Sequence, residues 1–163
     1  MLAWGHAAAQ VPPPEVPQNL RTPATETVLL KAQGRGKQIY ACKAAGAGHF
    51  EWTLERPQAE LLNDHGQVIG KHYEGPTWEA SDGSKVTGQV EQRANAPRAG
   101  AVPWLLLKAK STQGSGTFSR VNYIQRVATQ GGAAPTEGCD SSHPGAEMSI
   151  EYSADYYFYI PHP

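Results

Sequence analysis

No twelve-residue segment of this 163-residue chain combines apolar side chains at a 3.6-residue period with capping residues. The apolar residues fall instead in short runs, several of which alternate with polar residues. With 17 Gly and 13 Pro, the chain can form the many turns that join short strands. We therefore predict an all-β, single-domain antiparallel sandwich or barrel, with roughly seven to nine short strands and long loops.

The first runs predict a hairpin over residues 27–42. Its two strands, residues 27–33 and 37–42, are separated by a Gly-Arg-Gly sequence, which is typical of a turn. Residues 50–54 then alternate apolar and polar side chains, as a half-buried strand does. We expect Pro57 to interrupt the strand pattern before a short apolar run at residues 59–62.

The second half of the chain predicts further strands and one long loop. Residues 101–109 are the most apolar stretch, and the alternation over residues 117–127 places Ile124 and Arg126 on one face. Residues 129–146 are rich in turn-forming residues, and we expect a long loop there. The chain then closes with a run of aromatic residues, predicted to be a strand: Tyr156, Tyr157, Phe158 and Tyr159.

The N-terminal residues differ from the rest of the chain. Residues 1–10 hold Ala7 and Ala9 at the spacing of an A-x-A cleavage site, and we interpret them as a signal-peptide remnant; a plain alanine-rich tail is the alternative. Residues 11–26 contain five prolines, each of which fixes its own φ, so we expect an extended arm. The β domain is expected over residues 27–160.

The two cysteines, Cys42 and Cys139, lie 97 positions apart. An even number of cysteines in an exported protein indicates a disulfide, and two separate buried thiols are the alternative. Neither cysteine stands in a C-x-x-C motif or near a histidine at zinc-finger spacing, so we expect neither redox catalysis nor structural zinc. Together with the cleavage-site pattern, the cysteines predict a secreted or periplasmic protein.

The net charge and the absence of known motifs exclude several classes of partner from the prediction. The formal net charge is −1 and the basic residues are scattered, so we expect no nucleic acid partner. No apolar stretch approaches the roughly 18 residues of a membrane-spanning helix. The chain also lacks dinucleotide, P-loop, serine-hydrolase and H-E-x-x-H motifs, so we expect no cofactor and no metal. A glycan or small molecule is the expected partner, and the oligomeric state is left open.

The densest cluster of polar and aromatic side chains spans residues 71–84. On a strand, His72 and Glu74 would share one face, and Asp82 returns after a turn. A histidine and carboxylates within reach of one another can transfer protons or hold a divalent cation. Trp78 could stack on a sugar ring or an apolar ligand. The alternative is that these are solvated strand residues and ordinary turns.

A fifth candidate, Arg126, is a lone charge in an apolar strand. It could pair with a carboxylate such as Glu74 or Asp155, or lie with its aliphatic part along a sheet edge. The predicted ligand-binding residues are therefore His72, Glu74, Trp78, Asp82 and Arg126.

Several segments, in order along the chain, resemble those of one protein family. They are residues 36–42, 70–78, 82–86, 103–107, 123–132 and 152–159. The chain resembles domain of unknown function family 3455, found in bacterial and fungal proteins that often carry signal peptides. The resemblance implies export and a single compact unit, and it implies no activity. Some members are named malate dehydrogenase, but this chain has no dinucleotide fingerprint or βαβ pattern.

Three functions are compatible with these features. We favour a non-catalytic, extracytoplasmic binding or envelope-associated module, because the chain has aromatic strands and no catalytic signature. The alternative is a secreted enzyme acting on a carbohydrate or cell-wall substrate through His72, Glu74 and Asp82, which requires these side chains to converge in one pocket. A purely structural protein is the third.

Overall fold

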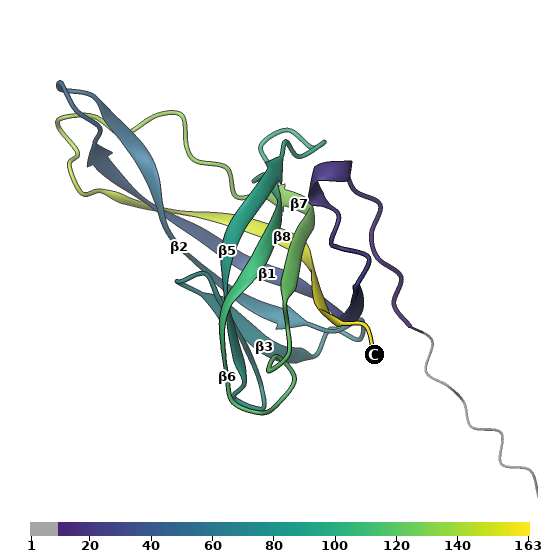
Figure 1. Cartoon of the computed structure of the whole chain (residues 1–163). Helices are drawn as coiled ribbons and strands as arrows, with labels where there is room; N and C mark the ends of the chain where they lie inside the picture. The colour runs from purple at the N-terminus through teal and green to yellow at the C-terminus, as the bar shows by residue number, and fades with distance from the viewer. Residues whose placement is uncertain (1–9) are drawn as a thin grey trace, which may run out of the picture.

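A computed structural model describes residues 10–163, and over this range eight antiparallel strands close into one barrel (Figure 1). They are β1 (Glu26–Ala44), β2 (Phe50–Leu62), β3 (Val68–Tyr73), β4 (Thr77–Ala80), β5 (Lys85–Ala94), β6 (Trp104–Gln113), β7 (Tyr123–Gly131) and β8 (Glu147–Pro161). Each strand pairs with the next, and β8 also pairs with β1. The predicted all-β single domain is confirmed, as a barrel. The signal-peptide remnant predicted over residues 1–10 lies outside the described residues, except for Gln10.

β1 runs without a break through the segment that the sequence predicts to be a turn. A Cβ on Gly34 would collide with the ring of Tyr156, and one on Gly36 would collide with the backbone beside Ala59. The glycines therefore let neighbouring strands approach closely as the barrel closes. The hairpin predicted over residues 27–42 is wrong, because glycine between two apolar runs serves close packing as well as turns.

Pro57 likewise does not interrupt β2, which continues to Leu62. The β1–β2 ladder shifts its register close to this proline, between Ile39 and Tyr40. The paired residues of β2 and β3 begin only at Ala59, so Pro57 lies where β3 does not flank the strand. A bulge and an unflanked stretch are the settings in which a strand tolerates proline.

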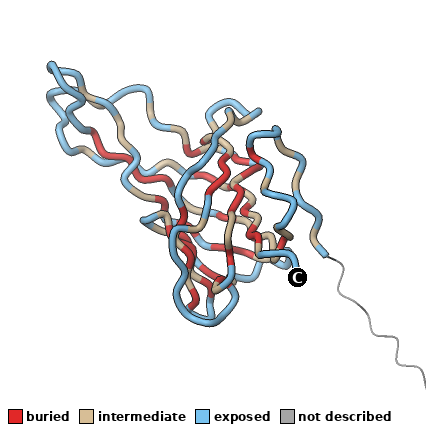
Figure 2. The backbone as a smooth tube through the Cα atoms, in the orientation of Figure 1, coloured by how far each residue is buried: buried red, intermediate tan, exposed pale blue. Residues whose placement is uncertain are grey.

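Aromatic side chains fill one part of the barrel interior. Phe118 stacks on Phe158 with 4.5 Å between ring centroids, and Trp78 meets Phe158 edge-on at 6.3 Å. Such pairs add about 1 kcal/mol each to the free energy of burial. Alternate residues of β8 belong to this core: Tyr152, Ala154, Tyr156 and Phe158. Figure 2 shows the buried residues following the strands of the barrel wall.

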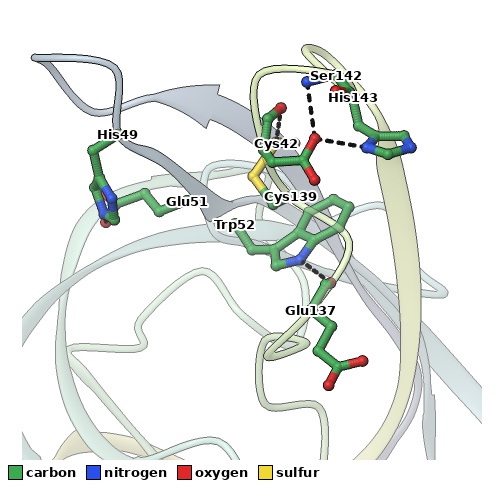
Figure 3. The surroundings of a disulfide bond; sticks show 9 residues. Cys42, His49, Glu51, Trp52, Glu137, Cys139, Ser142 and His143 are labelled. Atoms are coloured by element: carbon green, nitrogen blue, oxygen red, sulfur yellow. Dashed lines mark hydrogen bonds and ion pairs between the residues drawn. A yellow bond between two sulfur atoms is a disulfide. The ribbon is translucent and has the colours of Figure 1, made fainter.

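β1 and β2 continue beyond the barrel, accompanied by the start of β8 and the loop before it (Figure 1, upper left). We call residues 41–53 and 133–149 the extension. The predicted disulfide between Cys42 and Cys139 is confirmed and lies there (Figure 3). The indole N–H of Trp52 donates a hydrogen bond to the Glu137 carbonyl at 2.9 Å. Of the extension's residues, all of which are described, only Ala41 and Cys42 are buried.

The segment before β1 lies along the outside of the barrel beside β7 and β8 (Figure 1). Its 3₁₀ turn, η1 (Gln18–Leu20), ends at Leu20, which is fully buried. The Leu20 carbonyl accepts a hydrogen bond from the side chain of Gln125 at 2.7 Å. Buried packing therefore extends N-terminal to residue 27, where the sequence predicts the β domain to begin. No helix among residues 10–163 is long and apolar enough to cross a membrane.

Candidate functional site: a cavity inside the barrel

The barrel encloses a cavity of about 340 Å³. Every strand contributes to its lining. β1 and β6 do so through alternate, inward-facing residues, whereas β2 contributes the consecutive residues 54–57. Its exposed lining, including Leu54, Val90 and Arg93, marks the mouth. Its buried lining lies deeper and comprises Gln38, Tyr40, Pro57, His72, Trp78, Val102, Leu105, Leu107 and Tyr156.

His72 and Trp78 meet in this cavity because β3 and β4 pair there. The two residues are opposite each other in the β3–β4 ladder. Their rings stack with 4.4 Å between centroids and 16° between planes. The ring of Tyr156, brought in by β8, lies 5.2 Å from His72. The result is a continuous aromatic wall.

His72 is neutral at physiological pH. Burial lowers its pKa to about 3, and the positive charge of Arg126 acts in the same direction, although a hydrogen bond to Thr77 opposes them. Nδ1 lies 2.9 Å from the Thr77 carbonyl oxygen. Because a carbonyl can only accept, Nδ1 carries the ring proton and Nε2 is left as an acceptor. His72 therefore offers the cavity a flat, uncharged ring.

Arg126 is the charged group of the cavity wall. Its Nε and Nη2 atoms donate to the Pro103 carbonyl oxygen at 3.0 and 2.9 Å. Within residues 10–163, no carboxylate lies within 4.0 Å of its guanidinium. Asp155, one of the two partners considered from the sequence, pairs with Lys31 at 3.6 Å instead. A partly buried guanidinium thus borders the cavity without a counter-ion from the described part of the chain.

Two further polar side chains in the lining have unsatisfied hydrogen-bonding groups. Gln38 and Trp78 are each 1% exposed. Both amide atoms of Gln38 and the indole nitrogen of Trp78 are buried without a hydrogen-bond partner among the described residues. An unpaired buried polar group costs about 1–3 kcal/mol, and native structures contain few of them.

The remaining polar side chains of the buried lining are uncharged. Burial raises the pKa of Tyr40 and of Tyr156, so both side chains stay protonated phenols. The Tyr40 hydroxyl donates to the Gly132 carbonyl, and the Tyr156 hydroxyl lies 3.0 Å from that of Tyr152. The deeper part of the cavity therefore combines the guanidinium of Arg126 with neutral donors, acceptors and aromatic rings, and the other charged lining residues, Glu55, Arg56 and Arg93, lie towards the mouth.

The structure brings three of the five predicted site residues to this cavity: His72, Trp78 and Arg126. Glu74 is exposed in the β3–β4 turn, and Asp82 is exposed in the turn before β5. Neither carboxylate lines the cavity. The described residues also contain no cluster of three His, Cys, Asp or Glu side chains that could hold a metal ion.

Asp82 instead connects two loops at the surface. Its carboxylate accepts hydrogen bonds from the backbone N–H and hydroxyl groups of Ser84 and of Thr117, at 2.6–2.8 Å. These bonds hold the pKa of Asp82 well below its usual range. They link the turn before β5 to the loop between β6 and β7, which is a structural role.

Gln38 is a cavity residue that the sequence did not indicate. It stands between Lys37 and Ile39, where a polar residue on a strand normally faces solvent. Alternation does place Gln38 on the same face as Tyr40. The alternation therefore indicated which residues share a face with Gln38. It did not indicate which face points inward, because that depends on how the barrel closes.

A comparison with models of known protein families identifies the family of the chain. The model of the family described as "Protein of unknown function (DUF3455)" matches residues 23–160. The chain therefore belongs to this family, as its motifs suggested. Comparisons with curated proteins and with solved structures gave no match.

Proposed function

We propose that the protein is a non-catalytic binding module that holds a small molecule inside its barrel. The observation that carries this proposal is the pair Gln38 and Trp78, whose side chains line the cavity and whose polar atoms are buried and unpartnered within the described residues. A ligand with matching donors and acceptors would complete their hydrogen bonds. The cavity of about 340 Å³ also falls within the range of ligand sites, roughly 300–1,000 Å³.

We propose a non-catalytic role because of the protonation states of the side chains that line the cavity. A general acid or base works best when its pKa is near the operating pH, and the pKa of His72 is about 3. Among the described lining residues, Glu55 is the one carboxylate, and it pairs with Lys43 at 2.5 Å. The cavity thus offers recognition groups without an acid–base pair.

The proposed setting is secreted or periplasmic. The Cys42–Cys139 disulfide supports it, because disulfides form and persist in oxidising compartments.

A library of small acids, amides, amines and sugars, screened by ligand-observed NMR, tests the binding proposal. We expect ligands that bind the native chain and bind Gln38→Met about tenfold more weakly, the loss expected for one or two hydrogen bonds. Gln58→Met is the control, because Gln58 is exposed on the neighbouring strand and does not line the cavity.

Two outcomes would contradict the proposal. One is that no compound in the library binds. The other is that the bound compounds are insensitive to Gln38→Met, which would place their site elsewhere on the molecule.

A further inference from the structure

Positive charge dominates the ionisable lining of the cavity. Three arginines line it: Arg126 in the wall, and Arg56 and Arg93 towards the mouth. Glu55, already paired with Lys43, is the one carboxylate among the described lining residues. The cavity therefore attracts negative charge, although the whole chain has a formal net charge of −1.

Apart from Glu55, the other titratable side chains of the cavity wall carry no negative charge that would neutralise the arginines. His72 stays neutral because of its burial and the nearby guanidinium. Tyr156 stays protonated because burial raises its pKa. In a partly desolvated space, the attraction between a cation and an anionic ligand is stronger than in water.

The donors that remain suit a carboxylate. A guanidinium has five N–H donors in a planar fork, and the Pro103 carbonyl engages the Nε and Nη2 atoms of Arg126. Further N–H groups are left to pair with a carboxylate, the geometry that arginine favours. Trp78 and Gln38 line the same cavity, and their indole and amide nitrogens are buried donors without a partner among the described residues.

The rest of the lining suits an apolar ligand body. Leu105 and Leu107 are buried at the cavity, beside the stacked rings of His72 and Trp78. Leu54 and Val90, at the mouth, are two of the four large apolar side chains that stay exposed in the described chain, at 47% and 37%. An inorganic anion would leave this apolar surface without a partner.

We propose that the ligand is a small organic acid, whose carboxylate binds Arg126 while its apolar body lies against the aromatic and leucine walls. This inference rests on the proposed binding function and specifies its substrate class. A neutral ligand and an inorganic anion are the competing occupants, and the experiment below separates them.

Calorimetric titration with carboxylates and their uncharged amides tests the proposal. The pairs are benzoate with benzamide, phenylacetate with phenylacetamide, and hexanoate with hexanamide; inorganic phosphate is titrated as well. We expect at least one carboxylate to bind tenfold or more tightly than its own amide. Arg126→Gln should abolish this preference without weakening amide binding.

Arg120→Gln is the control, because Arg120 is an exposed arginine that does not line the cavity. Its carboxylate affinity should equal that of the native chain. If thermal melting shows that Arg126→Gln is unfolded, Arg126→Lys replaces it. Lysine keeps the charge but not the planar fork, so we expect an intermediate loss of carboxylate affinity.

The possible failures are distinguishable. Equal affinity for carboxylates and amides, or a preference that survives Arg126→Gln, overturns the acid proposal and leaves the binding proposal standing. If phosphate binds as tightly as the best carboxylate, the claim that the ligand has an apolar organic body is contradicted. If neither series binds but other library compounds do, the ligand class is wrong. If nothing binds, the proposed function fails as well.

Discussion

The barrel and the extension are parts of the same sheet, but different forces hold them. The barrel surrounds packed aromatic rings, and strands from all sides contribute to that core. The extension buries two residues, and a disulfide and loop hydrogen bonds connect its segments (Figure 3). The cross-link therefore lies where hydrophobic packing is weakest.

The comparison also explains where a binding site can form. A barrel stabilised by its packed core can tolerate several polar groups that lower its stability in exchange for recognition. The extension has no such reserve, and its polar groups are paired locally: Asp140 accepts hydrogen bonds from Ser142 and His143. The proposed binding site and the covalent support thus lie in separate regions.

Removal of the disulfide should have the largest effect. Replacing Cys42 and Cys139 together with serine releases a constraint over 97 positions, which should lower the free energy of unfolding by about 4–5 kcal/mol. Urea denaturation measures the loss. Hydrogen exchange should show residues 133–146 losing protection more than the barrel strands. A loss below about 1 kcal/mol would show that the extension is held without its cross-link.

Acid should destabilise the barrel through His72. Its folded-state pKa of about 3 lies below the ordinary 6.5, so the unfolded chain takes up a proton first as the pH falls. Stability is then complete above about pH 6.5 and is lost towards pH 3. Between pH 7 and pH 4 the loss should be about 3 kcal/mol.

Urea denaturation at both pH values, for the native chain and His72→Gln, measures this contribution. The variant should lose about 3 kcal/mol less than the native chain. His65→Gln is the control, because His65 is exposed in a turn outside the cavity. Parallel loss in the native chain and His72→Gln would contradict the assignment.

Two buried glutamines allow the proposed binding groups to be distinguished from polar groups that stabilise the fold. Gln38→Met removes amide atoms with no partner in the described chain, and should raise the free energy of unfolding by about 1–3 kcal/mol. Gln125→Met should lower it by a similar amount, because Gln125 bonds to Leu20 and to the Tyr159 hydroxyl. Thermal and urea denaturation measure both. Changes in the same direction would refute the distinction.

Trp52→Phe should have the smallest effect. The substitution removes the hydrogen bond to the Glu137 carbonyl, which should cost about 1 kcal/mol. Hydrogen exchange should detect the loss in residues 133–146, with the barrel strands unchanged. Equal loss of protection in the barrel would show that the two regions unfold as one unit.

Much of the fold could be predicted from local pattern. Of the strand predicted over residues 117–127, the part from residue 123 is confirmed, and residues 117–122 form a turn and irregular chain instead. The alternation does place Ile124 and Arg126 on one face, since Ile124 belongs to the core and Arg126 lines the cavity. The long loop before β8 and the disulfide also follow from turn-forming residues and cysteine number. These features depend on local composition or on a single pairing, which a sequence can display directly.

The composition of the cavity could not be predicted from the sequence, because it depends on how the barrel closes. His72 and Trp78 are six positions apart and meet through one hairpin, but Arg126 reaches them only because β7 and β8 complete the circle. Asp82 looked like a catalytic partner because it is near in sequence, yet its turn directs it to Ser84 and Thr117. Sequence proximity could not separate these cases.

The central claim is that the barrel cavity, and not the extension, receives a ligand. The most direct test is a ¹H–¹⁵N spectrum of the indole N–H groups, assigned with tryptophan-to-phenylalanine variants and titrated with the best-binding compound of the library. Trp78 should show the largest shift, because its N–H gains a partner. Trp52 should stay in place, because its N–H already bonds to Glu137. A moving Trp52 signal beside an unchanged Trp78 signal would contradict the account.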